Sequence, residues 1–189
     1  MNKTEKQQRG FDVPFTATRS EDGKRYIEGY FALYNSITEL WKGYEEVIEP
    51  GAFRDTLTND IRVLFDHDTS KVLGRNTSGT AELREDAKGL FAKVEVPDTT
   101  DGNNLYVLVS RGDVNQASFG FNILEEDVEE LPGNCYRWHL RKIDLHEVSI
   151  VTFPAYRDTV VHARNDEVVQ LRARKLEQRK QELRKKVRR

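Results

Sequence analysis

The sequence predicts an α+β fold built mainly from antiparallel strands, arranged as a β-barrel or a strongly curved sheet with a few short helices. Short apolar or alternating segments dominate most of the chain. Turn signals such as Leu131-Pro132-Gly133-Asn134 recur at spacings typical of antiparallel connections rather than of βαβ crossovers. Residues 164–189 lack every aromatic residue, Gly and Pro, which separates a basic helical tail from the body.

The expected strands lie between residues 11 and 153. Residues 1–10 (MNKTEKQQRG) are polar and are expected to form a flexible leader. The body then spans residues 11–163 and the tail residues 164–189. The strand candidates are Phe11–Ala17, Tyr26–Leu33, Tyr44–Ile48, Arg62–Phe65, Lys71–Gly74, Ala81–Leu83, Gly89–Val96, Asn115–Leu124, Tyr136–Arg141 and Leu145–Phe153.

Two short helices are expected to interrupt these strands. Gly51–Leu57 follows Pro50, and proline favours the first position of a helix. Leu105–Arg111 follows Asp101, a candidate cap, and its apolar residues share one helical face.

Composition excludes several classes of protein. A chain of 189 residues has room for one domain of ordinary size plus an appendage. Nine Phe, seven Tyr and two Trp are too many for a disordered chain. No apolar stretch approaches the ~18 residues of a membrane helix, and the polar start lacks a signal peptide, so we expect a soluble protein made in a cytoplasm. Cys135 is the single cysteine, which excludes a disulfide framework within the chain.

Charge divides the chain more sharply than the net value of −2 indicates. The tail carries eleven Lys/Arg against four Asp/Glu, and the rest of the chain is correspondingly acidic. The block Glu125–Glu130 holds five carboxylates in six residues, which predicts a long solvated hairpin arm or a surface for a basic partner. An acidic body, and a tail without aromatics for base stacking, argue against a nucleic-acid partner.

Absent motifs narrow the chemistry further. The chain has no phosphate-binding G-x-x-x-x-G-K-[ST] loop, no G-x-G-x-x-G turn, no H-E-x-x-H helix and no G-x-S-x-G elbow. Nucleotide-binding proteins, zinc peptidases and α/β-hydrolases are therefore disfavoured. We expect no metal and no cofactor.

Three residues stand out as candidates for catalysis. His67 ends a strand in which Val63 shares its face, so it is either a capped strand-end histidine or a base. Ser118 lies between core-facing Ala117 and Phe119, within either a small-residue patch or an open approach to a nucleophile.

The third candidate is Glu147, which lies on a partly apolar strand face. An unpartnered carboxylate there would be costly, and a histidine that becomes cationic would be a suitable partner. His146 lies on the opposite face of the same strand. His139 and His162 are expected to have ordinary structural roles.

Several short motifs together resemble the tailed-bacteriophage prohead proteases, serine peptidases of capsid maturation related in fold to herpesvirus assemblin. The resemblance runs from about Tyr26 to Ala163, and the joint order and spacing of the motifs make it specific. The motifs are Glu28-Gly29-Tyr30-Phe31-Ala32, Glu49-Pro50-Gly51-Ala52-Phe53, Phe65-Asp66-His67-Asp68, Val72-Leu73-Gly74, Gly89-Leu90, Ser118-Phe119-Gly120-Phe121, Leu145-His146-Glu147-Val148-Ser149-Ile150-Val151 and Pro154-Ala155.

This resemblance implies roles for individual residues. His67 would be the general base, Ser118 the nucleophile and Glu147 the third member that orients the imidazole, with His146 as the alternative third member. Arg157 is the candidate stabiliser of the oxyanion, by analogy with an arginine-bearing loop in the herpesvirus enzymes.

The resemblance also implies a biological setting. The enzyme would be packaged in the immature capsid in the host cytoplasm, where it cleaves the scaffolding protein or a scaffold-like segment of the major capsid protein, and then itself. The herpesvirus relatives act as dimers, so a homodimer is left open. The alternative from another class is a catalytically idle assembly protein that uses the same barrel to bind scaffold.

The tail shows a weak seven-residue repeat. Val169, Leu176 and Leu183 recur at this spacing. Ala173, Lys180 and Val187 occupy the intervening positions. A lysine in the seam disfavours an autonomous coiled coil. The tail is therefore either a solvated helix without a partner or a helix that docks on an acidic or helical scaffold segment.

Overall fold

The computed structural model describes residues 6–12, 14–153 and 158–187, and the chain divides into two units. The first unit, Lys3–Ala155, contains the two β-sheets and helix α1. The second contains helix α2 (Asp158–Val187). Each unit is described by itself.

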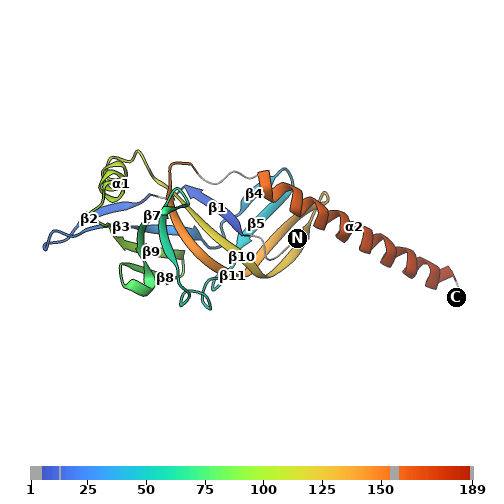
Figure 1. The fold of residues 1–189 in the computed structure, drawn as a ribbon. Coiled ribbons are helices and arrows are strands. Elements are labelled where there is room, and N and C mark those ends of the chain that lie inside the picture. The colour runs from blue at the N-terminus through green and yellow to red at the C-terminus, as the bar shows by residue number, and fades with distance from the viewer. Residues whose placement is uncertain (1–5, 13, 154–157, 188–189) are drawn as a thin grey trace. The chain divides into compact units, whose positions relative to one another are not determined.

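Within the described residues the larger sheet has seven strands, and it is built around one long hairpin of β10 and β11 (Figure 1). Strand β6 joins this sheet by pairing with β11, and β7 joins it by pairing with β6. The main path runs in the order β1 (Gln7–Asp12), β10 (Gln116–Leu131), β11 (Cys135–Val151), β5 (Tyr44–Ile48) and β4 (Thr38–Trp41), and the joining strands are β6 (Arg62–Phe65) and β7 (Asp68–Arg75).

The smaller sheet has four strands and lies against the larger one, with β3 in contact with β1 and β10. Its order is β2 (Thr16–Arg19), β3 (Arg25–Leu33), β9 (Gly89–Glu95) and β8 (Ala81–Glu85). A short 3-10 turn, η1 (Asn76–Ser78), precedes β8, and helix α1 (Thr100–Arg111) follows β9.

Strand β11 organises the larger sheet because both of its edges are paired. One edge pairs with β10 in antiparallel fashion along nearly its whole length. The other edge pairs in parallel first with β5 and then, over residues 147–150, with β6. The end of β6 is therefore held one strand away from β10, across β11.

Aromatic side chains from several elements fill the core. Phe119 packs edge-on against Phe53 at 5.5 Å between ring centroids and stacks on Phe121 at 4.8 Å. Alternate residues of β10 thus face the core, and the intervening residues lie on the other face of the strand. Fully buried large side chains include Phe31, Ile61, Leu90, Leu105 and Trp138.

Three expectations from the sequence are corrected by the structure. Neither sheet closes on itself within the described chain, so the body is two open sheets rather than a barrel. Residues 7–10 of the expected leader form part of β1, because their backbone pairs with β10. The expected helix Gly51–Leu57 is a chain of turns, since Gly51 has φ of 88° and the hydrogen bonds join residues three apart, as from Arg54 N to Gly51 O.

The strand prediction is confirmed in kind and corrected in extent. Seven of the nine strand pairings among the described residues are antiparallel, and β6 has the predicted bounds. The segment predicted as Phe11–Ala17 divides between β1 and β2, and β4 was not predicted. The three last predicted strands form the single long hairpin of β10 and β11, whose bulges interrupt the alternation. Helix α1 begins earlier than predicted, with Thr99 rather than Asp101 as its cap.

The acidic arm predicted over Glu125–Glu130 is the distal part of this hairpin, and most of its side chains are exposed. Cations of β11 line up opposite. Arg137 approaches Glu129 at 3.5 Å, and Arg141 bonds Asp127. The arm is thus partly neutralised by its own partner strand.

Helix α2 includes residues 164–187 of the predicted tail and begins before it. The described side chains from Arg172 to Gln181 are all exposed, including Leu176 of the seven-residue repeat. No helix in the described part of the chain is long and apolar enough to cross a membrane.

Candidate active site

The turn between β6 and β7 carries His67. Phe65 pairs with Asp68, so Asp66 and His67 form a two-residue hairpin loop, and both have positive φ (53° and 58°). Two-residue loops that match the strand twist require positive φ at both positions, and Asp and His tolerate this region better than most residues. The β6 alternation therefore stops at Phe65, and His67 extends from a turn rather than from a strand face.

Asp66 fixes this turn against the end of β11. Its backbone N–H donates to Ile150 O at 3.0 Å. Its carboxylate accepts from the N–H of Thr152 at 2.7 Å and from the hydroxyl of Thr152 at 3.0 Å. The histidine next to it is therefore held relative to β11 by three hydrogen bonds.

Strand register places the other two candidates side by side. Ser118 of β10 lies opposite Ser149 of β11, and Gly120 lies opposite Glu147. Ser118 and Gly120 belong to the face of β10 that does not point at the aromatic core. Ser118 and Glu147 are 0% and 4% exposed.

The structure brings His67, Ser118 and Glu147 together in one chain of hydrogen bonds. The imidazole Nε2 lies 2.8 Å from Ser118 Oγ, and Nδ1 lies 2.9 Å from Glu147 Oε1. An ionised carboxylate can only accept, so Nδ1 carries the proton that bonds Glu147. Nε2 is then free to accept the hydroxyl proton of Ser118.

Further groups keep Glu147 ionised. Burial alone would raise the pKa of Glu147, but the hydrogen bond and charge of His67, with Ser149 and Lys6, hold that pKa below its ordinary value. The hydroxyl of Ser149 donates to Glu147 Oε2 at 2.6 Å, and Lys6 Nζ lies 3.2 Å from Oε1. Both carboxylate oxygens are therefore occupied.

Gly120 provides the space for this carboxylate. A Cβ built on Gly120 would lie 2.2 Å from Glu147 Oε1 and 2.3 Å from Lys6 Cε. Any side chain at this position would displace the atoms that meet His67.

The remaining residues singled out from the sequence lie elsewhere or outside the described residues. His146 is half-exposed, with Nε2 4.0 Å from Asp144, and is not joined to His67. His139 bonds Glu49 and Glu129 on the hairpin arm. Arg157 and the side chain of His162 lie outside the described residues.

Sequence reasoning missed the supporting residues of the site. Ser149, Asp66, Gly120 and Lys6 all lie in or near the quoted motifs or the leader, but only the register of β1, β10 and β11 shows what they contact. Among the described residues, no cluster of three or more His, Cys, Asp or Glu could hold a metal ion.

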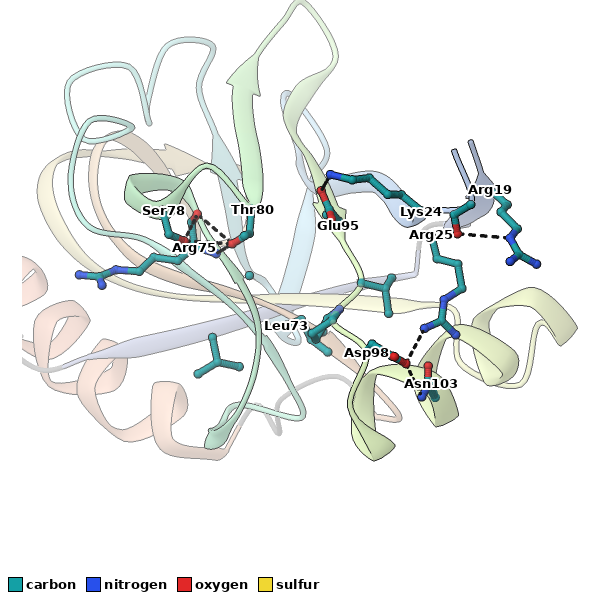
Figure 2. A pocket seen from close by; sticks show the side chains of 15 residues that line it. Arg19, Lys24, Arg25, Leu73, Arg75, Ser78, Thr80, Glu95, Asp98 and Asn103 are labelled. Atoms are coloured by element: carbon teal, nitrogen blue, oxygen red, sulfur yellow. Dashed lines mark hydrogen bonds and ion pairs between the residues drawn. The ribbon is translucent and has the colours of Figure 1, made fainter. Parts of the chain in front are cut away.

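A hollow of about 930 Å³ lies away from these residues, between β7, the β2–β3 turn and the start of α1 (Figure 2). Its cations are largely paired. Lys24 bonds Glu95 at 2.9 Å, and Arg25 Nη2 lies 3.5 Å from Asp98, toward which Asn103 also turns. None of the three hydrogen-bonded candidates lines this hollow.

Comparison with known proteins gives three findings. Residues 12–174 match the family described as caudovirus prohead serine protease. The prohead protease of Enterobacteria phage HK97 is 31% identical over 150 residues, which cover 76% of this chain and 60% of that protein's length. The structure of the bacteriophage T4 capsid assembly protease gp21 superposes with a TM-score of 0.52 at 9% identity, covering 79% of this chain and 98% of that one, and so supports the fold alone.

Gly120→Ala should break the contact between His67 and Glu147 without unfolding the protein. The atoms that a methyl group would meet are the ends of two flexible side chains, so the stability cost should be about 1–3 kcal/mol. We expect loss of the downfield proton NMR signal of the His67 Nδ1–H, measured together with urea unfolding. A retained signal would show that Gly120 does not define the site.

Glu147→Gln should remove a pH dependence of stability. Because the pKa of Glu147 is lowered from 4.5 in the folded state, the unfolded chain binds more protons just below pH 4.5. The stability due to ionised Glu147 is thus complete above pH 4.5 and is lost as the pH falls through the folded value. The difference in free energy of unfolding between the native chain and Glu147→Gln should shrink over that range. A constant difference from pH 6 to pH 3 would contradict the assignment.

Proposed function

The chain belongs to the caudovirus prohead serine protease family, and on this premise we propose that it is a serine endopeptidase of phage capsid maturation. The observation that carries the proposal is the unbroken hydrogen-bonded chain from Ser118 through His67 to Glu147. The chain spans about 60% of the length of the HK97 relative, so activity, substrates and partners are part of the proposal.

In the proposed mechanism Ser118 is the nucleophile and His67 the general base. As Ser118 Oγ attacks the scissile carbonyl carbon, Nε2 of His67 takes the hydroxyl proton, and the carbonyl oxygen becomes an oxyanion. Glu147 holds the imidazole in the tautomer that leaves Nε2 unprotonated, and it stabilises the imidazolium.

The remaining steps return the base to its starting state. The imidazolium gives its proton to the leaving amine as the peptide C–N bond breaks, leaving an acyl ester on Ser118. Water then attacks the ester with His67 again as base, which releases the carboxylate product and restores the hydroxyl. Arg157 stays a prediction for stabilising the oxyanion.

The proposed substrates are the scaffolding protein, or a scaffold-like segment of the major capsid protein, and the protease itself, inside the prohead. The name of the HK97 relative, a prohead protease, supports this setting. Homodimerisation stays a prediction. The alternative function is an idle assembly protein that binds scaffold through the same sheets without cutting it.

Ser118→Ala and His67→Ala should each abolish processing and leave a folded protein, since neither change removes much buried apolar area. The experiment is co-expression with the capsid and scaffold genes, followed by mass spectrometry of the fragments. His146→Ala is the matched control, because His146 is next to Glu147 in sequence but lies outside the hydrogen-bonded chain. This variant should process the capsid and scaffold proteins normally.

The outcomes separate the two functions. In Ser118→Ala and in His67→Ala the amount of cleaved fragments should fall by at least ~10³-fold, because the two residues act as a unit in catalysis. Shells that assemble without fragments from the native chain would support the idle assembly protein. Undiminished cleavage by Ser118→Ala would exclude Ser118 as the nucleophile.

We further propose that the tail delivers the protease to the shell. The segment Lys175–Arg189 lies beyond the family match and carries eight Lys/Arg against two Glu. The described side chains of α2 between Arg172 and Gln181 are exposed, and Lys180 bonds Glu177 at 2.7 Å. An acidic segment of the scaffold would meet these cations at the surface of the helix. Such docking would weaken with salt, because exposed charges are screened beyond ~8 Å at physiological ionic strength.

Deleting Lys175–Arg189 should leave cleavage of a short peptide near normal and lower the number of proteases per prohead several-fold. A chain with Lys175, Arg179, Lys180 and Arg184 changed to Gln should show the same packaging defect, counted by quantitative mass spectrometry of purified proheads. Normal packaging of both variants would exclude docking by the tail. Loss of peptide cleavage on deletion would show that the tail supports the fold instead.

A further inference from the structure

Lys6 contacts the same carboxylate oxygen as the catalytic histidine. Its Nζ lies 3.2 Å from Glu147 Oε1, and His67 Nδ1 lies 2.9 Å from that oxygen. The second oxygen of Glu147 accepts the hydroxyl of Ser149. Lys6 and His67 therefore share one acceptor, and the cation lies beside the group that would become an imidazolium.

The pairing of β1 with β10 brings Lys6 to this position. Gln8 lies opposite Gly120 and Gly10 lies opposite Ser118, so the strand runs directly beside the nucleophile. The Lys6 stem passes over Gly120, where a Cβ would lie 2.3 Å from its Cε. The space left by the absent side chain of Gly120 is thus occupied by both the Glu147 carboxylate and the Lys6 side chain.

Strand β1 is anchored firmly enough to hold the cation there. Arg9 is buried and bonds the carboxylate of buried Glu46 through Nε at 2.5 Å and Nη2 at 2.8 Å. Phe11 stacks on Phe119 with ring centroids 6.0 Å apart. These contacts fix the strand immediately after Lys6 to the core of the larger sheet.

The other charges around the pair have their own partners. Arg62 of β6 lies opposite Glu147 in register, but its guanidinium contacts Asp60 at 3.2 Å. Asp66 is bonded to Thr152, and Asp68 accepts from Ser70 and approaches Lys71 at 3.5 Å. Among the described lysines and arginines, Lys6 alone lies within ion-pair distance of the Glu147 carboxylate.

We infer that Lys6 is a positioning residue of the active site, which uses its charge to limit how readily His67 takes up a proton at rest. Glu147 favours the imidazolium, and a cation on the same oxygen opposes it. The base would then stay neutral, and able to accept the Ser118 proton, at lower pH than with Glu147 alone. This inference rests on the proposed triad.

The test compares Lys6→Met, which removes the charge, with Lys6→Arg, which keeps it. Lys24→Met is a matched control: both lysines pair with a carboxylate and are about half exposed, 45% for Lys6 and 49% for Lys24. The acid limb of the pH profile of kcat/KM on a peptide should move up by about 0.2–0.7 pH unit in Lys6→Met alone. High salt should shrink the shift, since the lysine is exposed.

A second measurement makes the inference independent of activity. In a Ser118→Ala background, the protonation of the His67 imidazole is followed by ¹⁵N NMR, and its midpoint should rise by the same amount in Lys6→Met. Equal midpoints in Lys6→Met, Lys6→Arg and the native chain would overturn the inference. An equal fall in kcat/KM in both Lys6 variants, with unmoved profiles, would overturn it too, because it would show a purely structural role. Cleavage by the Ser118→Ala chain would refute the proposed function, and the NMR midpoints would still decide the role of Lys6.

Discussion

A carboxylate buried within the larger sheet, on a strand that is paired at both edges, constrains the whole site. Glu147 is 4% exposed, and an ionised group so placed is tolerated only when its lone pairs are satisfied. His67, Ser149 and Lys6 supply donors from three separate parts of the chain. The absence of a side chain at Gly120 gives those donors room to converge. Satisfying one buried charge therefore dictates sequence at positions far apart along the chain.

The fold meets this constraint by pairing both edges of β11. Antiparallel β10 brings Ser118 beside it, and parallel β6 leads into the turn that carries His67. That turn holds two non-glycine residues at positive φ, a conformation that costs free energy and that surrounding contacts must maintain. The hydrogen bonds of Asp66 to Ile150 and Thr152 provide those contacts.

Sequence patterns predicted the strand class and the long hairpin at Pro132-Gly133, and the family resemblance selected three residues that the structure brings together. They could not predict what depends on register. Alternation alone placed His67 on a strand face, whereas pairing of Phe65 with Asp68 puts it in a turn. The polarity of residues 7–10 indicated a leader. Arg9 is nevertheless buried in the sheet, because its charge is paired with the buried carboxylate of Glu46. Sheet closure depends on long-range pairing and twist, which short apolar segments do not encode.

The central claim is that the Ser118 hydroxyl is activated by a histidine held by Glu147. It is tested most directly by covalent capture with a fluorophosphonate, in which Ser118 Oγ forms a bond to phosphorus and fluoride leaves. Peptide mapping by mass spectrometry of the full chain should find the adduct on Ser118 in the native protein, and a rate of labelling lowered by about 10²-fold or more in His67→Ala. Labelling of another residue, or equal labelling of Ser118 with and without His67, would contradict the account.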